Sequence, residues 1–197
     1  MSRDIWRKDY ESYYREHREK GASVYDIEWC RSFTEKYVEN PESRKSLLDV
    51  GCGDGIWSIA LSDRFDVTGV DNSEEGIRNA NMLKEKHGSN ARFVLGDIES
   101  IDTKFDVVFS RGPEFFGGYA PDSEVFQRFF PIVLNLCKER LYFIVYSREP
   151  FGRYYNEEKT SYFHDPDTID SLLSRHGRTE SVFEDNYIVS RLDISER

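Results

Sequence analysis

A glycine-rich stretch between two apolar segments most constrains how this chain can fold. Residues 47–50 form a short apolar run, Gly51, Gly53 and Gly55 follow at alternate positions, and residues 56–61 then have the character of a helix. Glycines let the backbone turn sharply and approach a ligand closely. The free amides at the start of a helix favour an anionic group such as a carboxylate. We therefore predict a strand, a ligand-binding loop and a helix in direct succession.

The rest of the chain alternates between strand-like and helix-like segments. Such alternation predicts an α/β fold in which a parallel sheet carries helices on both faces. The two last strand-like segments are joined by a short polar turn, so we expect an antiparallel last strand. With residues 47–50, the predicted strands number seven; the others are residues 66–71, 91–95, 105–110, 140–147, 179–183 and 187–192. After the helix of residues 56–61, the predicted helices are residues 73–87, 122–137 and 167–176.

The first forty-five residues have a different texture and predict two helices. The first ends at Gly21, and the second opens at Ser23 with Asp26 near the capping-box position. Aromatic residues recur in the first helix at helical spacing. They could form the buried stripe of an amphipathic helix, or the helix could be a lid over the ligand site. These residues are Trp6, Tyr10, Tyr13, Tyr14 and His17. We expect residues 1–45 to form a helical cap on a ligand-binding domain of residues 46–197, within a single structural domain.

Composition excludes several classes of function. The formal net charge is −10, and no dense run of Lys and Arg marks a surface for a nucleic-acid backbone, so nucleic acid is disfavoured as a substrate. The three cysteines, Cys30, Cys52 and Cys137, are too far apart for a metal motif or a disulfide framework, and we predict no metal site. Neither a signal peptide nor a membrane span is visible, so we expect a cytoplasmic protein.

The spacing of the loop, together with three later elements, resembles a known family. Nicotinamide and flavin sites usually carry G-x-G-x-x-G, whereas this chain has G-x-G-x-G, with Asp49 two residues before the first glycine. That pattern resembles motif I of the class I S-adenosylmethionine-dependent methyltransferases. Asp71 ends the second strand, Gly96-Asp97-Ile98 follows the third, and residues 105–110 resemble the family's fourth strand. The resemblance runs in order from about residue 46 to residue 192.

Membership of this family would imply a Rossmann-like fold, S-adenosylmethionine as cofactor and a set of binding residues. Asp71 would accept hydrogen bonds from the ribose diol, and its charge meets no structural need at a strand end. Asp97 would accept from the adenine amine, and Asp49 would either contact the ligand or order the loop. Cys52 is small and apolar, which favours packing over catalysis. The expected cofactor-binding residues are Asp49, Gly51, Cys52, Gly53, Asp71, Asn72, Gly96, Asp97, Ile98, Ser110, Arg111 and Tyr14.

The acceptor is less constrained by the sequence than the cofactor. The fourth strand ends in Ser110-Arg111-Gly112-Pro113, without the Asn/Asp-Pro-Pro-Tyr/Phe motif of many base and glutamine N-methyltransferases. Two loops, residues 111–119 and 151–164, fall at the carboxyl edge of the sheet, where α/β folds bind substrates. We expect a small-molecule or glycan acceptor. Its expected contacts are Arg111, Tyr119, Arg153 and Tyr154, although these could equally be solvated loop residues.

The expected reaction is in-line methyl transfer, and a hydroxyl acceptor would require a general base. His164 is the first candidate for that base and Glu114 the second. The alternatives are a non-catalytic methyltransferase-like subunit, a methyltransferase acting on protein or RNA, and a nicotinamide oxidoreductase. The sequence leaves the oligomeric state open.

Overall fold

The computed structural model describes residues 3–147, 163–184 and 186–194. The described residues form two compact units, Met1–Ile101 and Asp102–Arg197. No helix within these ranges is long and apolar enough to cross a membrane.

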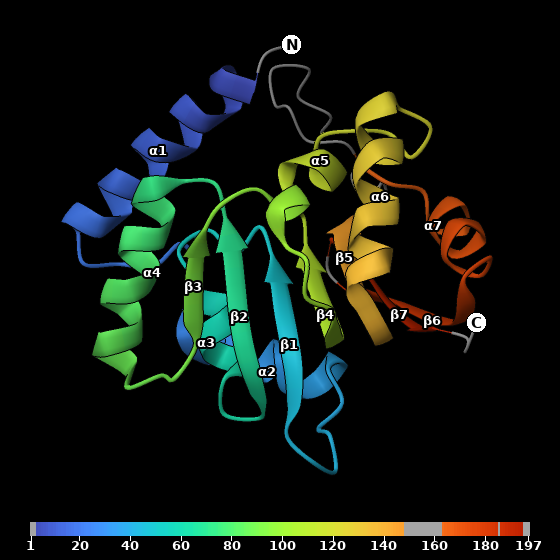
Figure 1. Cartoon of the computed structure of the whole chain (residues 1–197), viewed down its shortest axis with the longest axis horizontal. Helices are drawn as coiled ribbons and strands as arrows, with labels where there is room; N and C mark the ends of the chain where they lie inside the picture. The colour runs from blue at the N-terminus through green and yellow to red at the C-terminus, as the bar shows by residue number, and fades with distance from the viewer. Residues whose placement is uncertain (1–2, 148–162, 185, 195–197) are drawn as a thin grey trace. The chain divides into compact units, whose positions relative to one another are not determined.

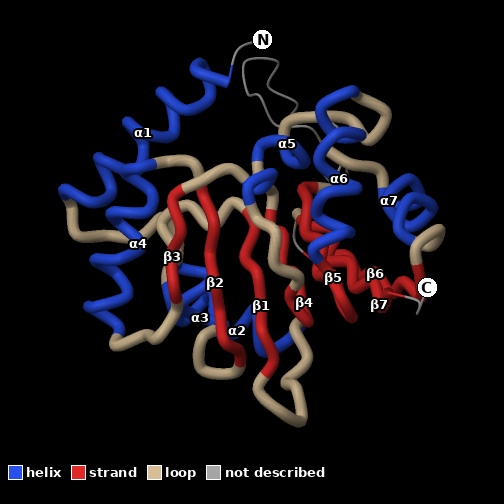
Figure 2. Tube along the Cα trace, viewed as in Figure 1, coloured by secondary structure: helices blue, strands red, loops and turns tan. Residues whose placement is uncertain are grey.

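The first unit contains three parallel strands in the order β3-β2-β1 (Figure 2). Along the chain its elements are α1 (Arg3–Glu19), α2 (Ile27–Tyr37), β1 (Lys45–Val50), α3 (Ile56–Leu61), β2 (Phe65–Asp71), α4 (Glu74–His87), β3 (Arg92–Leu95) and the 3₁₀ turn η1 (Ile98–Ser100). Helix α3 packs on β2, and α4 packs on both β2 and β3. Four successive buried residues end β1, as expected for a strand that is covered on both faces.

Local capping explains where the helices of this unit begin. Ser73 caps α4 by accepting a hydrogen bond from the Gly76 amide at 2.9 Å. Asp26, rather than Ser23, caps α2, because its carboxylate accepts from the Trp29 amide at 3.0 Å. Our placement of the second helix start at Ser23 was therefore wrong by one turn. Ser23 instead donates from Oγ to the carbonyl of Tyr25 within the linker.

The two N-terminal helices are attached to the first unit in different ways. Helix α2 packs on α3 through aromatic rings, with Phe33 and Trp57 at 5.3 Å and Trp29 and Trp57 at 5.4 Å between centroids. Helix α1 lies alongside α4 (Figure 1). Helix α2 thus contributes buried side chains to the core of this unit, whereas α1 contacts α4.

The second unit contains four strands in the order β4-β5-β7-β6. Its elements are β4 (Phe105–Arg111), α5 (Glu114–Gly117), α6 (Glu124–Leu136), β5 (Cys137–Tyr146), α7 (Pro166–Leu173), β6 (Gly177–Glu184) and β7 (Tyr187–Ile194). Strand β5 is parallel to β4, whereas β7 is antiparallel to both β5 and β6. The described strands therefore number seven, and the expectation of a mostly parallel sheet with an antiparallel last strand is confirmed.

A cluster of phenylalanines forms the core of the second unit. Helix α6 packs on β4 and β5, and α7 packs on β6 and β7. The rings of Phe116, Phe126 and Phe143 are completely buried and contact one another at centroid distances of 4.8 to 6.2 Å. Aromatic pairs at such distances add to the stability that burial itself provides.

Candidate functional site

The glycine loop between β1 and α3 has the backbone geometry that its sequence predicts. Gly51, Gly53 and Gly55 have φ angles of 70°, 55° and 74°, in the left-handed region that other residues rarely adopt. The amides of Gly51 and Cys52 both donate to the carbonyl of Val70, at 2.9 and 3.0 Å. The loop therefore turns sharply and is fastened to the end of the neighbouring strand β2.

Two side chains of this segment are directed into the protein. Asp49 is buried, and its Oδ2 accepts a hydrogen bond from Oγ of Ser58 on α3 at 2.6 Å. Of the two roles left open for Asp49, this contact supports the ordering of the loop. Cys52 is also buried, and burial, followed by the charges of Asp71 and Asp49, raises the pKa of its thiol. A thiol held in its protonated form is a poor nucleophile, which agrees with a packing role.

Asp71, at the end of β2, binds the glycine loop through its carboxylate. Its Oδ2 accepts from the amide of Gly53 and its Oδ1 from that of Ser73, both at 2.8 Å. Burial raises the pKa of Asp71, and the amide bonds from Ser73 and Gly53 oppose that rise. The charge therefore has a structural use, contrary to our expectation. Asn72, the next residue, is exposed.

The segment after β3 lies beside the end of β2. Gly96 donates from its amide to the carbonyl of Asp71 at 2.9 Å, which joins the two strand ends. Asp97 precedes the η1 turn and is exposed, and its carboxylate makes no capping hydrogen bond to the described turn. Ile98, the next residue, is buried.

Tyr14 of α1 covers the glycine loop. A Cβ added at position 53 would collide with the Tyr14 hydroxyl and the ring carbons next to it. Burial, and then the charge of Asp71, raises the pKa of Tyr14 well above its usual range. The structure thus brings together Tyr14, Gly53 and Asp71, from three separate elements of the first unit.

Asp54 was not among the residues that the sequence indicated. Its Oδ2 accepts from the amide of Val24 in the α1–α2 linker at 2.6 Å, and its Oδ1 from the amide of Ile56 at 3.3 Å. Burial raises the pKa of this carboxylate, although both amides oppose the rise. Asp54 therefore ties the linker to the glycine loop. Its position between two glycines was the available signal, but nothing in the sequence indicated Val24 as its partner.

In the second unit, the end of β4 holds Ser110 and Arg111, both expected to bind the cofactor and Arg111 also expected to contact the acceptor. Ser110 is completely buried, and the guanidinium of Arg111 donates from Nη2 to the Tyr187 hydroxyl at 2.6 Å. The same guanidinium lies 5.0 Å from the centre of the Tyr187 ring. Tyr187, the first residue of β7, was missed because it is distant in sequence from the motif. Glu114, which starts α5, and Tyr119 are partly exposed.

His164 lies in the core of the second unit. Its ring is 0% exposed, and Nε2 is 2.8 Å from the carbonyl oxygen of Phe116. Because a carbonyl only accepts, Nε2 carries the proton and donates. Burial lowers the pKa of His164 to about 4, although this hydrogen bond opposes the shift. The placement favours a structural role over the base role suggested by the sequence.

Two expected acceptor contacts, Arg153 and Tyr154, lie outside the described residues. Within the described ranges, no group of three or more His, Cys, Asp or Glu side chains is arranged to hold a metal ion.

Comparison with known proteins adds a family and a fold. A family model described as a methyltransferase domain matches residues 41–168. A malonyl-[acyl-carrier protein] O-methyltransferase of Ilyobacter polytropus is 34% identical over 104 residues, which are 46% of this chain and 39% of that protein. The release factor glutamine methyltransferase of Bacillus subtilis is 33% identical over 88 residues, 40% of this chain and 31% of that protein. The chain therefore spans less than half the length of these curated relatives.

A solved structure is similar over nearly the whole chain. The magnesium protoporphyrin IX methyltransferase of Synechocystis PCC 6803, crystallised with bound SAH, has a TM-score of 0.73 and covers 98% of this chain and 99% of its own. The sequence identity is 16%, so this likeness shows the fold alone. The Rossmann-like fold implied by the motifs is confirmed.

Proposed function

Because this chain belongs to the family of methyltransferase domains whose model matches its residues 41–168, we propose that it transfers a methyl group from S-adenosylmethionine to a small acceptor. The observation that carries this proposal is the arrangement in the first unit, where Asp71 holds the amide of Gly53 beside the end of β2. An acid at this position is suited to bind the ribose of a nucleoside cofactor.

The residues around the glycine loop fit S-adenosylmethionine. A carboxylate has about four acceptor positions, and Asp71 uses one oxygen for Gly53 and the other for Ser73, so capacity remains for ribose hydroxyls. Asp97 is exposed and could accept a hydrogen bond from an adenine amine, and the buried Ile98 holds the turn that carries it. The left-handed glycines turn the loop sharply, and Tyr14 lies directly against Gly53, where it could contact the amino-acid part of the cofactor.

The chemistry divides between cofactor and protein. When bound, S-adenosylmethionine supplies a methyl group already activated on a sulfonium. The protein has to hold the donor and orient the acceptor in line with it, and such alignment alone can lower a barrier by about 7–11 kcal/mol. A carboxylate, thiolate or neutral amine acceptor requires no base. For a hydroxyl acceptor, Glu114 is the stronger candidate, because its side chain is partly exposed and that of His164 is not.

A small acceptor with an acidic group accounts best for the residues at the end of β4. Arg111 is held there by Tyr187, and a guanidinium matches a carboxylate or phosphate in a bidentate geometry. Similarity to a protein named for malonyl-[acyl-carrier protein] supports such an acceptor. A protein acceptor is the main alternative, since the Bacillus subtilis relative is named for a release factor. The absence of a Pro-Pro motif after Ser110 argues against a planar amide.

Calorimetry with SAH, S-adenosylmethionine and a nicotinamide dinucleotide tests the donor. We expect binding of the first two alone. Asp71→Asn should weaken binding by about one to two powers of ten, because charge-assisted hydrogen bonds contribute about 1.5–3 kcal/mol. Asp66→Asn removes the same charge from the opposite end of β2, where Asp66 pairs with Arg44, and should bind as the parent does.

Equal affinity in the parent and in a folded Asp71→Asn protein would refute the ribose assignment. A screen with isotopically labelled donor across carboxylates, phosphosugars, hydroxylated aromatics, peptides and RNA tests the acceptor. Robust, salt-sensitive labelling of RNA alone would refute the proposal of a small acceptor. Donor binding without any labelling would favour a non-catalytic subunit.

A further inference from the structure

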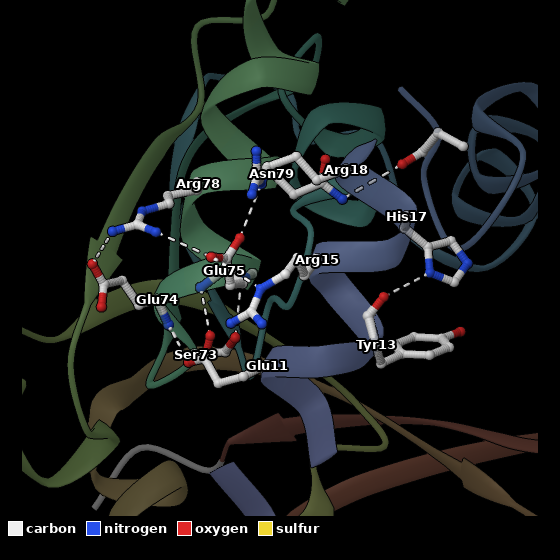
Figure 3. A network of polar contacts seen from close by, with 12 residues as sticks. Glu11, Tyr13, Arg15, His17, Arg18, Ser73, Glu74, Glu75, Arg78 and Asn79 are labelled. Atoms are coloured by element: carbon white, nitrogen blue, oxygen red, sulfur yellow. Dashed lines mark hydrogen bonds and ion pairs between the residues drawn. The ribbon is translucent and has the colours of Figure 1, made fainter. Parts of the chain in front are cut away.

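Helix α1 is joined to α4 by a carboxylate that serves both helices. Oε1 of Glu11 accepts from the amide of Glu74 at 2.7 Å, and Oε2 accepts from the amide of Glu75 at 2.9 Å (Figure 3). These amides are the first two of α4, and backbone amides there have no partner within their own helix. Glu11 therefore caps a helix that begins 63 residues later in the chain.

This cap supplements the one that α4 has already. Oγ of Ser73 accepts from the third amide, that of Gly76, so Ser73 and Glu11 divide the first three amides between them. A negative charge is favoured at a helix N-terminus, where the helix dipole is positive. The contact of Glu11 thus stabilises the position of α1 against α4. Helix α4 does not need this contact to begin, because Ser73 also caps it.

A second polar contact joins the side chain of Glu75, in the same first turn of α4, to the following residues of α1. Glu75 is only 5% exposed, and Nε of Arg18 donates to it at 2.9 Å, while Arg15 is 3.6 Å away and Arg78 is 3.0 Å away (Figure 3). Burial raises the pKa of Glu75, but the hydrogen bond and charge of Arg18 and the charges of Arg78 and Arg15 outweigh it, so the pKa is lowered. Glu75 is therefore held in its charged form between two helices.

The face of α1 that contacts α4 also carries Tyr14. Three residues follow Glu11 at intervals that place them on the same helix face: Tyr14 by three residues, Arg15 by four and Arg18 by seven. Tyr14 lies over Gly53 while its neighbours bind α4. The position of Tyr14 across the glycine loop is therefore coupled to the contacts that Glu11 and Arg18 make.

These contacts are sensitive to salt, unlike those of α2. Partly exposed ion pairs are weakened by screening, whereas the aromatic packing of Phe33 on Trp57 is not. Helix α1 ends at Glu19, and Gly21 follows it with a φ of 62° and a carbonyl that accepts from Nζ of Lys86 at 3.0 Å.

We propose that Glu11 is a positioning residue of the donor site: by capping α4 from α1, it holds Tyr14 across the glycine loop. This inference rests on the proposed function of that loop. When α1 is released, a smaller fraction of the protein is competent to bind the donor, and the apparent dissociation constant rises in proportion. Donor affinity should therefore fall with rising salt, and Glu11 should be responsible for part of that fall.

The test measures SAH affinity of the full chain by calorimetry at low and high sodium chloride. Glu11→Ala should weaken binding about five- to tenfold at low salt, as expected from the loss of a helix cap. Its salt dependence should be smaller than that of the parent. Glu16→Ala is the matched control, because Glu16 lies on the same helix, carries the same charge and pairs with Lys20 instead of α4. It should behave as the parent does.

A double-mutant cycle separates positioning from general stability. If Glu11 acts through Tyr14, the Glu11→Ala/Tyr14→Ala protein should bind SAH no more weakly than the weaker single variant. Additive losses, or equal effects of Glu11→Ala and Glu16→Ala, would overturn the inference. Limited trypsin digestion gives a readout independent of the donor, since the backbone at Arg15, Arg18 and Lys20, in and just after α1, should be cleaved faster when α1 leaves α4 and unwinds.

Cleavage at these residues should be faster in Glu11→Ala and unchanged in Glu16→Ala. If the parent binds no SAH, the proposed function fails, while the digestion still decides whether Glu11 fastens α1. If the parent binds SAH and Glu11→Ala is neither weaker in affinity nor faster in cleavage, the positioning role fails alone.

Discussion

Acidification should destabilise this protein partly through His164, whose ring is buried in its neutral form. The ring is 0% exposed, and Nε2 donates to the carbonyl of Phe116. Burial lowers the pKa of His164 from 6.5 to about 4, and the unfolded chain has no such burial. Between pH 6.5 and about 4, the unfolded state therefore binds a proton at His164 that the native state does not bind. The stabilising contribution is complete above pH 6.5 and is lost as the pH falls towards 4.

The size of the effect follows from the pKa difference. At 1.36 kcal/mol for each pKa unit, the interval from 6.5 to about 4 corresponds to about 3 kcal/mol. This is a large part of the about 5–15 kcal/mol by which native proteins are stable. It requires little discount for solvent screening, because the ring is fully buried.

Urea unfolding followed by circular dichroism at pH values from about 7.5 to about 4 measures this contribution. His164→Gln should be less stable than the parent at neutral pH, and the difference should shrink by about 3 kcal/mol as the pH falls through that range. Phe143→Leu is the control, since it disturbs the same aromatic core without a titrating group. Its difference from the parent should be the same at every pH.

A pH-independent difference for His164→Gln would refute the argument that the buried ring stays neutral. Methyl transfer measured in the same variant addresses its chemical role. If His164→Gln kept its stability and lost activity, the base role would be restored. Reduced stability with activity retained in the folded fraction would agree with the structural role.

Three further expectations concern the donor, the N-terminal helix and the acceptor. Asp97→Asn keeps a carbonyl oxygen for the adenine amine and should bind SAH nearly as the parent does, whereas Asp97→Ala should bind about tenfold more weakly. Equal binding by all three proteins in calorimetry would leave Asp97 without a role in the donor site. Deleting the residues before Gly21 should leave the circular dichroism spectrum of a folded α/β protein, since α2, not α1, packs aromatic rings on α3. The same deletion should weaken the binding of SAH. Unfolding of the shortened protein would assign the aromatic stripe of α1 to the core. Arg111→Ala should raise the KM of an acidic acceptor about tenfold or more and leave SAH affinity unchanged. A KM equal to that of the parent would show that other residues determine the specificity for the acceptor.

The order of strands and helices could be read from the sequence because its signals are local. Short apolar runs, each ended by polar or glycine residues, marked the strands, and the glycine spacing marked the loop after β1. Asp71 and Asp97 could be located because Asp71 ends β2 and Asp97 lies just after β3, and the carboxyl ends of neighbouring parallel strands lie together. A residue whose position follows from its own strand can be predicted without knowledge of the rest of the fold.

Contacts between distant segments were decided by the tertiary structure. His164 belongs to a segment that is polar and aromatic in sequence, yet it is buried, and a carbonyl 48 residues earlier accepts a hydrogen bond from its ring. Arg111 is held by Tyr187, 76 residues later, and Glu11 caps a helix 63 residues later. No local pattern specifies such pairs, since charged, aromatic and polar residues are common on solvent-exposed surfaces. Only the packing of one element on another determined which of them became part of the core, the donor site or the contact between α1 and α4.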